Sequence, residues 1–235
     1  MPAKTGLTRD IFMSDTDSFI DEVTEEVRRD RLFLMLKRYG WVGGLAVALI
    51  VGGAAWREYR MGQQQAAAQD LGDAIVAALA ADAPEERAAA LASVSANTET
   101  GAAIAKMMQA GALAEAGDAE GAVALLSEVA ATGELELIYR HIASFKALAL
   151  QADTLGVSDR RIQYEALAQP GAPLALLASE QLALLEVEEG DPEAAIRRLQ
   201  AIVADATVSR DLKDRATQVI VALGGNPDGT EASDG

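Results

Sequence analysis

The chain has 235 residues, of which half are hydrophobic and only 4% aromatic, and it contains no cysteine, which excludes disulfide bonds, thiolate metal ligands and a cysteine nucleophile. Its formal net charge of −16 is concentrated in residues 57–235, which hold 13 basic and 28 acidic residues. Because nucleic-acid binding relies on basic side chains that displace counterions, this acidic body argues against a nucleic-acid partner. The apolar content is mostly Ala and Leu, which favours helices.

Residues 1–38 are predicted to form an N-terminal segment with a short amphipathic helix. Ser18 precedes two acids in the expected first turn, and Phe19, Val23 and Val27 recur every four residues as a narrow apolar stripe. The segment carries seven basic and eight acidic residues. Two interpretations stay open, a helix that lies on the membrane or a partner and a solvated helix that leads into the next segment.

The next segment, from Tyr39 to Trp56, has 18 residues and no charged side chain. As a helix it would extend about 27 Å, close to the thickness of the hydrocarbon core of a bilayer. Its glycines would also allow a partner helix to approach closely. The residues predicted to lie at the membrane interface, where aromatic rings and basic groups favour the headgroups, are Lys37, Arg38, Tyr39, Trp41, Trp56, Arg57 and Tyr59.

Two other interpretations of this apolar run compete with a membrane anchor. The small residues Gly53-Ala54-Ala55 have the spacing of a signal-peptide cleavage site, but the run begins far from residue 1 and follows an acidic leader. A buried core helix would need a surrounding domain, which residues 1–38 are too short to supply. Five basic residues precede the run within a short distance and two follow it, so the positive-inside rule places the N-terminal side in the cytoplasm.

The region after the span contains four turn-like points, near Ala83, Gly117, Gly156 and Gly190, separated by 34, 39 and 34 residues. Gly117-Asp118 and Gly190-Asp191 are typical of a left-handed glycine that ends one helix and an acid that starts the next. A period of 34 residues in helical hairpins is the tetratricopeptide signature. The sequence therefore predicts an all-α fold, a single transmembrane helix followed by an α-solenoid of degenerate tetratricopeptide-like helical hairpins. An ordinary helical bundle is the alternative.

The sequence thus predicts four regions: a cytoplasmic segment 1–38, a transmembrane helix 39–56, a tetratricopeptide-like domain 57–223 on the opposite side of the membrane and a disordered acidic tail 224–235. A last helix from about Arg210 to Leu223 is predicted to cap the stack. The residues predicted to form the shared core are Leu113, Val123, Leu126, Ile142, Leu148, Leu182, Leu185, Ile196, Leu199 and Ile202.

The sequence gives little sign of catalysis. His141 is the single histidine and lies in a helical pattern, no catalytic or phosphate-binding motif is present, and the acidic runs Glu85–Glu86 and Glu186–Glu189 are interpreted as solvated helix faces. We therefore expect a binding protein that is not an enzyme, with no cofactor, no metal and no small-molecule substrate. The residues predicted to line a partner groove on the first helices of the hairpins are Met107, Lys146, Glu180, Leu184 and Glu188.

The motif SFIDEVTEEVRRDRLF, from Ser18 to Phe33, leads into Tyr39-Gly40-Trp41, and with the span and the loose repeats it resembles the YfgM-like family, the ancillary subunits of the bacterial Sec translocon. This resemblance implies an inner-membrane protein beside the Sec translocon, a membrane-anchored periplasmic chaperone of the prolyl-isomerase type as a partner, and a role in handling exported proteins. An envelope or cell-division scaffold and a secreted soluble repeat-type binding module remain the alternatives.

Overall fold

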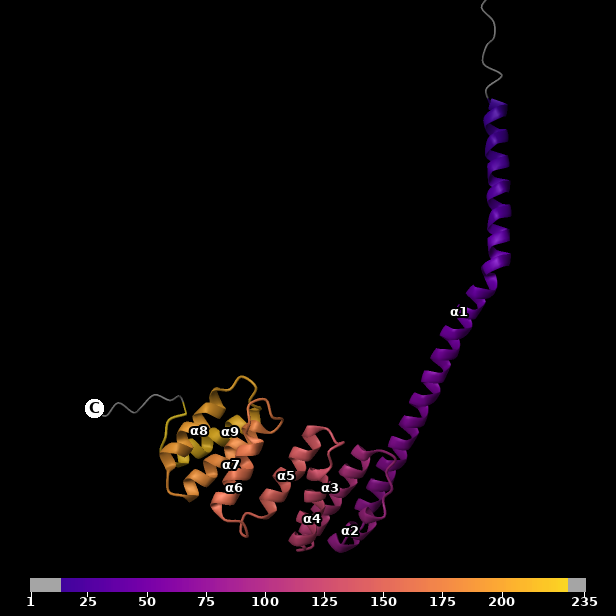
Figure 1. The fold of residues 1–235 in the computed structure, drawn as a ribbon. Coiled ribbons are helices and arrows are strands. Elements are labelled where there is room, and N and C mark those ends of the chain that lie inside the picture. The colour runs from indigo at the N-terminus through magenta and orange to yellow at the C-terminus, as the bar shows by residue number, and fades with distance from the viewer. Residues whose placement is uncertain (1–13, 228–235) are drawn as a thin grey trace, which may run out of the picture. The chain divides into compact units, whose positions relative to one another are not determined.

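The computed structural model describes the backbone of residues 14–227 and the side chains of Met35 and of residues 37–227. In this part of the chain every regular element is a helix, so the all-α prediction is confirmed there (Figure 1). The helices are α1 (Ser14–Leu79), α2 (Pro84–Ala92), α3 (Glu99–Glu115), α4 (Ala119–Ala131), α5 (Leu137–Leu150), α6 (Val157–Leu167), α7 (Ala175–Glu188), α8 (Pro192–Ala204) and α9 (Arg210–Ala222).

The chain divides into two compact units, Met1–Gln65 and Ala66–Gly235, and α1 contributes to both. The helix begins four residues before the predicted start at Ser18. The predicted apolar stripe of Phe19, Val23 and Val27 lies outside the residues whose side chains are described. The second unit begins at residue 66, whereas the predicted domain begins at residue 57. The difference arises because α1 first continues as a polar helix, and its residues join the core only from about Leu71 and Ile75.

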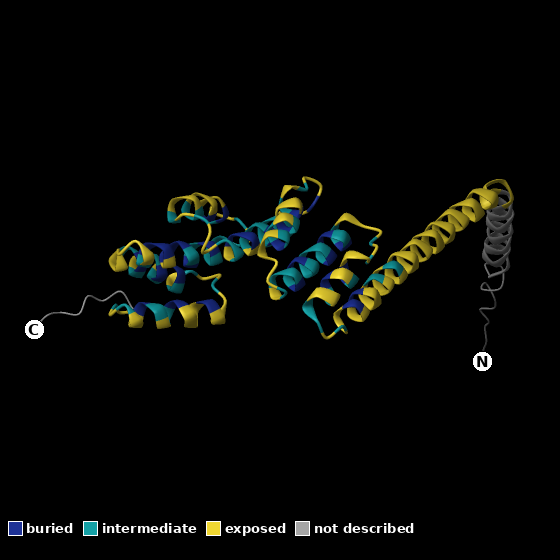
Figure 2. Ribbon diagram, turned by 90° about the horizontal axis from the view of Figure 1, so that it is seen from below, coloured by how far each residue is buried: buried dark blue, intermediate teal, exposed yellow. Residues whose placement is uncertain are grey.

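The predicted span is helical, and its side chains are not covered by protein. Every residue from 37 to 66 is exposed, which Figure 2 shows as a continuous yellow stretch of α1. Leu49 and Ile50 are 68% and 71% exposed. Exposure of apolar side chains to water costs about 25 cal/mol per Å² of apolar surface, so this stretch is unfavourable in water alone. The stretch lies in the one helix of the described chain that is long and apolar enough to cross a membrane.

The local turn signals of the sequence are confirmed in the second unit. Gly117 and Gly190 have φ of +86° and +82°, the left-handed region that favours glycine. Asp118 then accepts a hydrogen bond from the amide of Gly121 at 2.8 Å and begins α4. Asp191 accepts one from the amide of Ala194 at 2.9 Å and begins α8. Pro84 and Pro192 each occupy the first turn of a helix, where the missing amide hydrogen has no cost.

Four small hydrophobic clusters form the core, and each joins about three consecutive helices. The first joins the end of α1 to α2 and α3, the second joins α3, α4 and α5, the third joins α5, α6 and α7, and the fourth joins α7, α8 and α9. Helices α2 to α5 pack closely on one another, as do α6 to α9, whereas α5 and α6 are joined more loosely. Each helix thus buries its apolar face mainly against its neighbours in sequence.

Six of the ten predicted core residues are buried: Leu126, Leu148, Leu182, Leu185, Leu199 and Ile202. The other four, Leu113, Val123, Ile142 and Ile196, are partly exposed. Many core positions are alanines, and those with no exposed surface are Ala110, Ala122, Ala143, Ala178, Ala183, Ala195 and Ala216. The predicted capping helix is present as α9, whereas residues 228–235 of the predicted tail lie outside the described residues.

Candidate protein-binding groove

The aromatic residues predicted at the membrane interface are exposed at both ends of the apolar run. Tyr39 and Trp41 lie at its start, and Trp56 and Tyr59 lie at its end with their ring centroids 6.4 Å apart. The guanidinium of Arg60 lies 5.6 Å from the centre of the Trp56 ring, an arrangement that suits a cation–π contact. This end of the run thus presents amphipathic rings and a cation together, as headgroup-level residues do. The remaining predicted interface residues, Lys37, Arg38 and Arg57, are exposed as well.

A hollow of about 400 Å³ lies between α1, α3 and α5, with one lining residue from α2. It contains two of the five predicted groove residues, Met107 of α3 and Lys146 of α5. Its other lining residues are Leu79, Arg87, Ile104, Met108, Gly111, Ala112, Glu115 and Ile142. Its volume is within the range of ligand pockets, and its long unbranched methionines are the side chains that adapt most easily to different apolar partners.

Three charged residues line this hollow, and two of them neutralise each other. Arg87 of α2 forms an ion pair with Glu115 of α3 and also donates to the carbonyl of Asp82 at 2.8 Å. Lys146 is exposed and forms no ion pair with any residue that the structure describes. The hollow therefore combines an apolar surface with one unpaired ammonium group.

The other three predicted groove residues all lie on α7 and do not line this hollow. Glu180 is only 7% exposed, and both of its oxygens accept hydrogen bonds from Arg215 of α9, at 2.9 and 2.8 Å. Glu188 accepts two from Arg160 of α6, at 2.7 and 2.9 Å. Leu184 is exposed. Both glutamates thus already have partners within the chain, and they connect α7 to its neighbours.

Sequence reasoning did not assign Ile104, Met108 and Gly111 to the groove. With Met107 and Glu115 they follow the helical spacing i, i+3, i+4, i+7 and i+11, which places them along one face of α3. This periodicity was available in the sequence. What the sequence could not supply was the contribution of Leu79 from α1 and Ile142 from α5, because that depends on how the hairpins stack.

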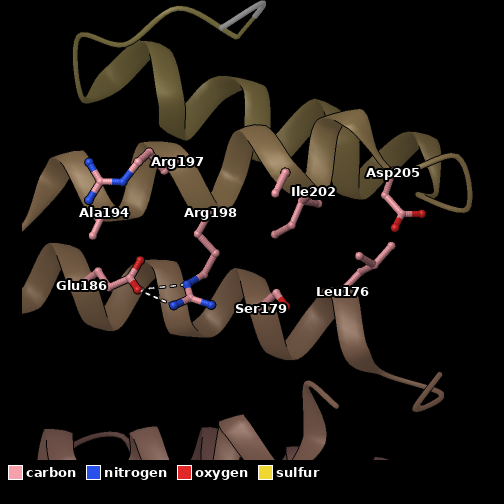
Figure 3. A pocket seen from close by; sticks show the side chains of 9 residues that line it. Leu176, Ser179, Glu186, Ala194, Arg197, Arg198, Ile202 and Asp205 are labelled. Carbon is pink, nitrogen blue, oxygen red and sulfur yellow. Dashed lines mark hydrogen bonds and ion pairs between the residues drawn. The ribbon is translucent and has the colours of Figure 1, made fainter. Parts of the chain in front are cut away.

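A second hollow, of about 560 Å³, lies between α7 and α8 and is more polar (Figure 3). Leu176 and Ile202 lie toward one end, and Glu186 and Arg198 lie toward the other. Both the Nε and an Nη of Arg198 donate to one oxygen of Glu186, at 2.9 and 2.5 Å. The Oε1 atom of Glu186 is therefore occupied by Arg198, whereas its buried Oε2 atom forms no hydrogen bond with any described residue.

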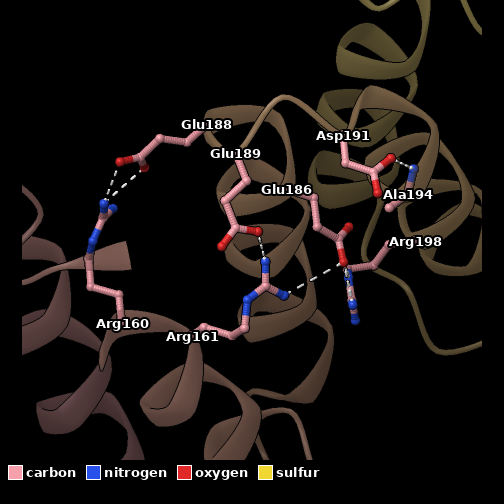
Figure 4. Close-up of polar contacts among 8 residues, drawn as sticks. All are labelled: Arg160, Arg161, Glu186, Glu188, Glu189, Asp191, Ala194 and Arg198. Carbon is pink, nitrogen blue, oxygen red and sulfur yellow. Dashed lines mark hydrogen bonds and ion pairs between the residues drawn. The ribbon is translucent and has the colours of Figure 1, made fainter. Parts of the chain in front are cut away.

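The interpretation of Glu186–Glu189 as a solvated helix face is wrong for Glu186, which is 6% exposed. Its carboxylate lies between Arg198 of α8 and Arg161 of α6, the latter at 4.0 Å (Figure 4). Arg161 also pairs with Glu189. These contacts bring one acid of α7 between two cations from neighbouring helices, which no pattern within α7 reveals. The other acidic run, Glu85–Glu86, is exposed as predicted.

The single histidine, His141, lies on α5 and is partly exposed. The Nδ1 atom of His141 is buried and forms no hydrogen bond with any described residue. Burial lowers the pKa of His141, and the neighbouring charge of Arg140 lowers it further. Within residues 37–227 no group of three or more histidine or acidic side chains is arranged to hold a metal ion.

Comparison of the chain with protein-family models, with curated proteins and with solved structures found no significant match. The family resemblance noted for residues 18–41 therefore stays an expectation from the sequence.

Proposed function

We propose that this protein is a single-pass membrane protein whose helical body binds other proteins. The observation that carries the proposal is the exposed helical stretch of 18 uncharged residues, Tyr39–Trp56, with aromatic and basic residues at both ends. Lipid would cover these side chains, which no described part of the protein covers. The apolar hollow between α1, α3 and α5 supplies a binding surface in the body.

The body is, in this proposal, a short α-solenoid of degenerate tetratricopeptide-like hairpins. The end of α1 with α2, α3 with α4, α5 with α6, and α7 with α8 are the four units, and α9 covers the last. The sequential clusters and the glycine-acid turns at 117–118 and 190–191 support this assignment. In such a stack the first helices of the hairpins line one face, and the hollow that contains Met107 and Lys146 lies on three of them.

The membrane is proposed to be a bacterial inner membrane, with the N-terminus in the cytoplasm and the body in the periplasm. The excess of basic residues before the span supports this orientation. The proposed role is that of an ancillary subunit of the Sec translocon that links it to a membrane-anchored periplasmic chaperone of the prolyl-isomerase type. This last assignment depends on the resemblance to the YfgM-like family alone.

Site-specific photocrosslinking in living cells tests the proposal. A photoreactive amino acid replaces Met107 in the hollow, and in a matched control it replaces Ala124, an exposed residue of α4 that does not line the hollow. We expect crosslinks to translocon subunits or to a membrane-anchored prolyl isomerase from position 107 and far fewer from position 124. Cell-division or envelope proteins at position 107 would favour the scaffold alternative. Equal labelling from both positions would contradict protein binding at this hollow.

A further inference from the structure

Lys146 differs from the other basic residues of the body because it lacks an ion pair within the described chain and also lines the hollow. Residues 66–227 contain 24 acidic and 11 basic residues, and eight of the basic ones form ion pairs. The three that form none within the described chain are Arg140, Lys146 and Lys213. Of these three, Lys146 alone lines the hollow between α1, α3 and α5. A cation that forms no ion pair within the described chain thus lies at this hollow.

The surroundings of Lys146 determine what would complement it. Ile142 lies one helical turn before it on α5, and Ile104, Met107 and Met108 line the hollow from α3. The nearest acid of the lining, Glu115, is already paired with Arg87. An occupant therefore meets apolar side chains and a single ammonium group that lacks a counter-charge. A partner that places a negative charge opposite this ammonium group is favoured over partners that place a neutral or positive group there.

We propose that the hollow receives a peptide segment of a protein partner that combines apolar side chains with one acidic side chain, whose carboxylate pairs with Lys146. The apolar side chains of the segment contact Ile104, Met107 and Ile142, and burial of these surfaces provides most of the affinity. The ion pair makes the hollow selective for a segment whose carboxylate reaches Lys146. An acidic segment that does not reach Lys146 is repelled by the net negative charge of the body. The inference depends on the proposed function, since it names the chemistry of the partner at the same surface.

The test measures binding of three short fluorescent peptides to the full chain in lipid nanodiscs, with empty nanodiscs as the blank. The peptides share one leucine- and methionine-rich sequence and carry Glu, Gln or Lys at one central position. We expect the Glu peptide to bind about fivefold more tightly than the Gln peptide, as a partly shielded ion pair allows, and the Lys peptide to bind most weakly.

Substitutions at Lys146 and Lys213, the two lysines of residues 66–227 that form no ion pair, separate the proposed contact from general electrostatic attraction. Lys146→Met keeps the apolar stem and should abolish the preference for Glu over Gln. Lys213→Met, on the exposed face of α9 and away from the hollow, should leave it intact. Lys146→Glu should reverse the order so that the Lys peptide binds best. Both lysines are exposed, so neither change disturbs the core.

Three results would overturn the inference: no peptide binds, all three bind equally to the unaltered chain, or Lys146→Met and Lys213→Met behave alike. If crosslinks form from position 107 while the peptides show no preference for Glu, then the proposed function stands and the acidic-segment inference alone is lost. If position 107 also gives no specific crosslinks, both are lost.

Discussion

Two glutamates of α7 are buried, and each pairs with arginines whose side chains stay partly exposed. Glu180 pairs with Arg215 of α9, and Glu186 lies between Arg161 of α6 and Arg198 of α8. Loss of the arginines would leave a buried carboxylate without solvent or counter-ion, which costs more than the pair itself contributes. We therefore expect the packing of α6 to α9 to depend on these ion pairs.

Glu186→Gln should lower the free energy of unfolding by about 2 kcal/mol, because two guanidinium groups lose their shared carboxylate. The matched control is Glu193→Gln, whose carboxylate is exposed and lies 3.8 Å from Arg197 one turn away. That change should cost less than about 0.5 kcal/mol. Urea unfolding of the full chain in detergent, followed by circular dichroism, measures both. Equal effects of the two substitutions would show that Glu186 is not structurally important.

His141 makes stability depend on pH in the weakly acidic range. Its pKa is lowered in the folded chain by burial and by Arg140, so the unfolded chain binds the proton more readily. Stability should therefore fall as the pH drops through the ordinary histidine pKa of about 6.5. His141→Gln should flatten the dependence of the unfolding midpoint between neutral and weakly acidic pH. An unchanged slope in the variant would contradict this assignment, because the chain has no other histidine.

At the level of helices, the sequence located the turns whose chemistry is local. The left-handed Gly117 and Gly190 and the capping acids Asp118 and Asp191 were all recognisable, because a helix end involves only a few adjacent residues. The burial of Glu186 was not recognisable, because it requires arginines from two other helices. Exposed and buried alanines look the same in the sequence, so the full burial of alanines such as Ala110 and Ala143 follows only from the packing of the helices.

Gly190→Ala should cost about 1 kcal/mol, because the residue has φ of +82° and a side chain there is strained even though nothing lies close enough to clash. The control is Gly156→Ala in the turn between α5 and α6, where φ is −62° and an alanine fits without strain. This control should leave stability unchanged or slightly raised. Thermal unfolding of both variants distinguishes them, and equal destabilisation would contradict the backbone explanation.

The apolar stretch of α1 should fail to anchor the protein when charges are placed at its centre. Val47→Arg combined with Leu49→Arg adds two groups that each cost about 3 kcal/mol at the middle of a bilayer. Gln63→Arg with Gln65→Arg makes the same change in the polar continuation of the same helix. Carbonate extraction should release the first variant from membranes and retain the second. Retention of both would argue against a span at residues 39–56.

At the level of the whole molecule, the sequence indicated a span followed by a helical body, and the structure has both a helix suited to a span and an all-helical body. The groove was less predictable. Met107 and Lys146 line the same hollow, while Glu180, Leu184 and Glu188 lie on α7 outside it. The loose junction between α5 and α6 lies where two successive turns are 39 residues apart instead of 34. The position of α7 relative to α5 therefore could not be extrapolated from a regular spacing in the sequence.

Protease accessibility in spheroplasts tests the central claim, an anchor with the acidic body outside the cytoplasm, most directly. The full chain carries one epitope tag at each end, and protease is added before or after the inner membrane is disrupted. We predict that intact spheroplasts lose the C-terminal tag and keep a short protected fragment that carries the N-terminal tag and the span. Survival of the C-terminal tag until the membrane is disrupted would contradict the proposed topology.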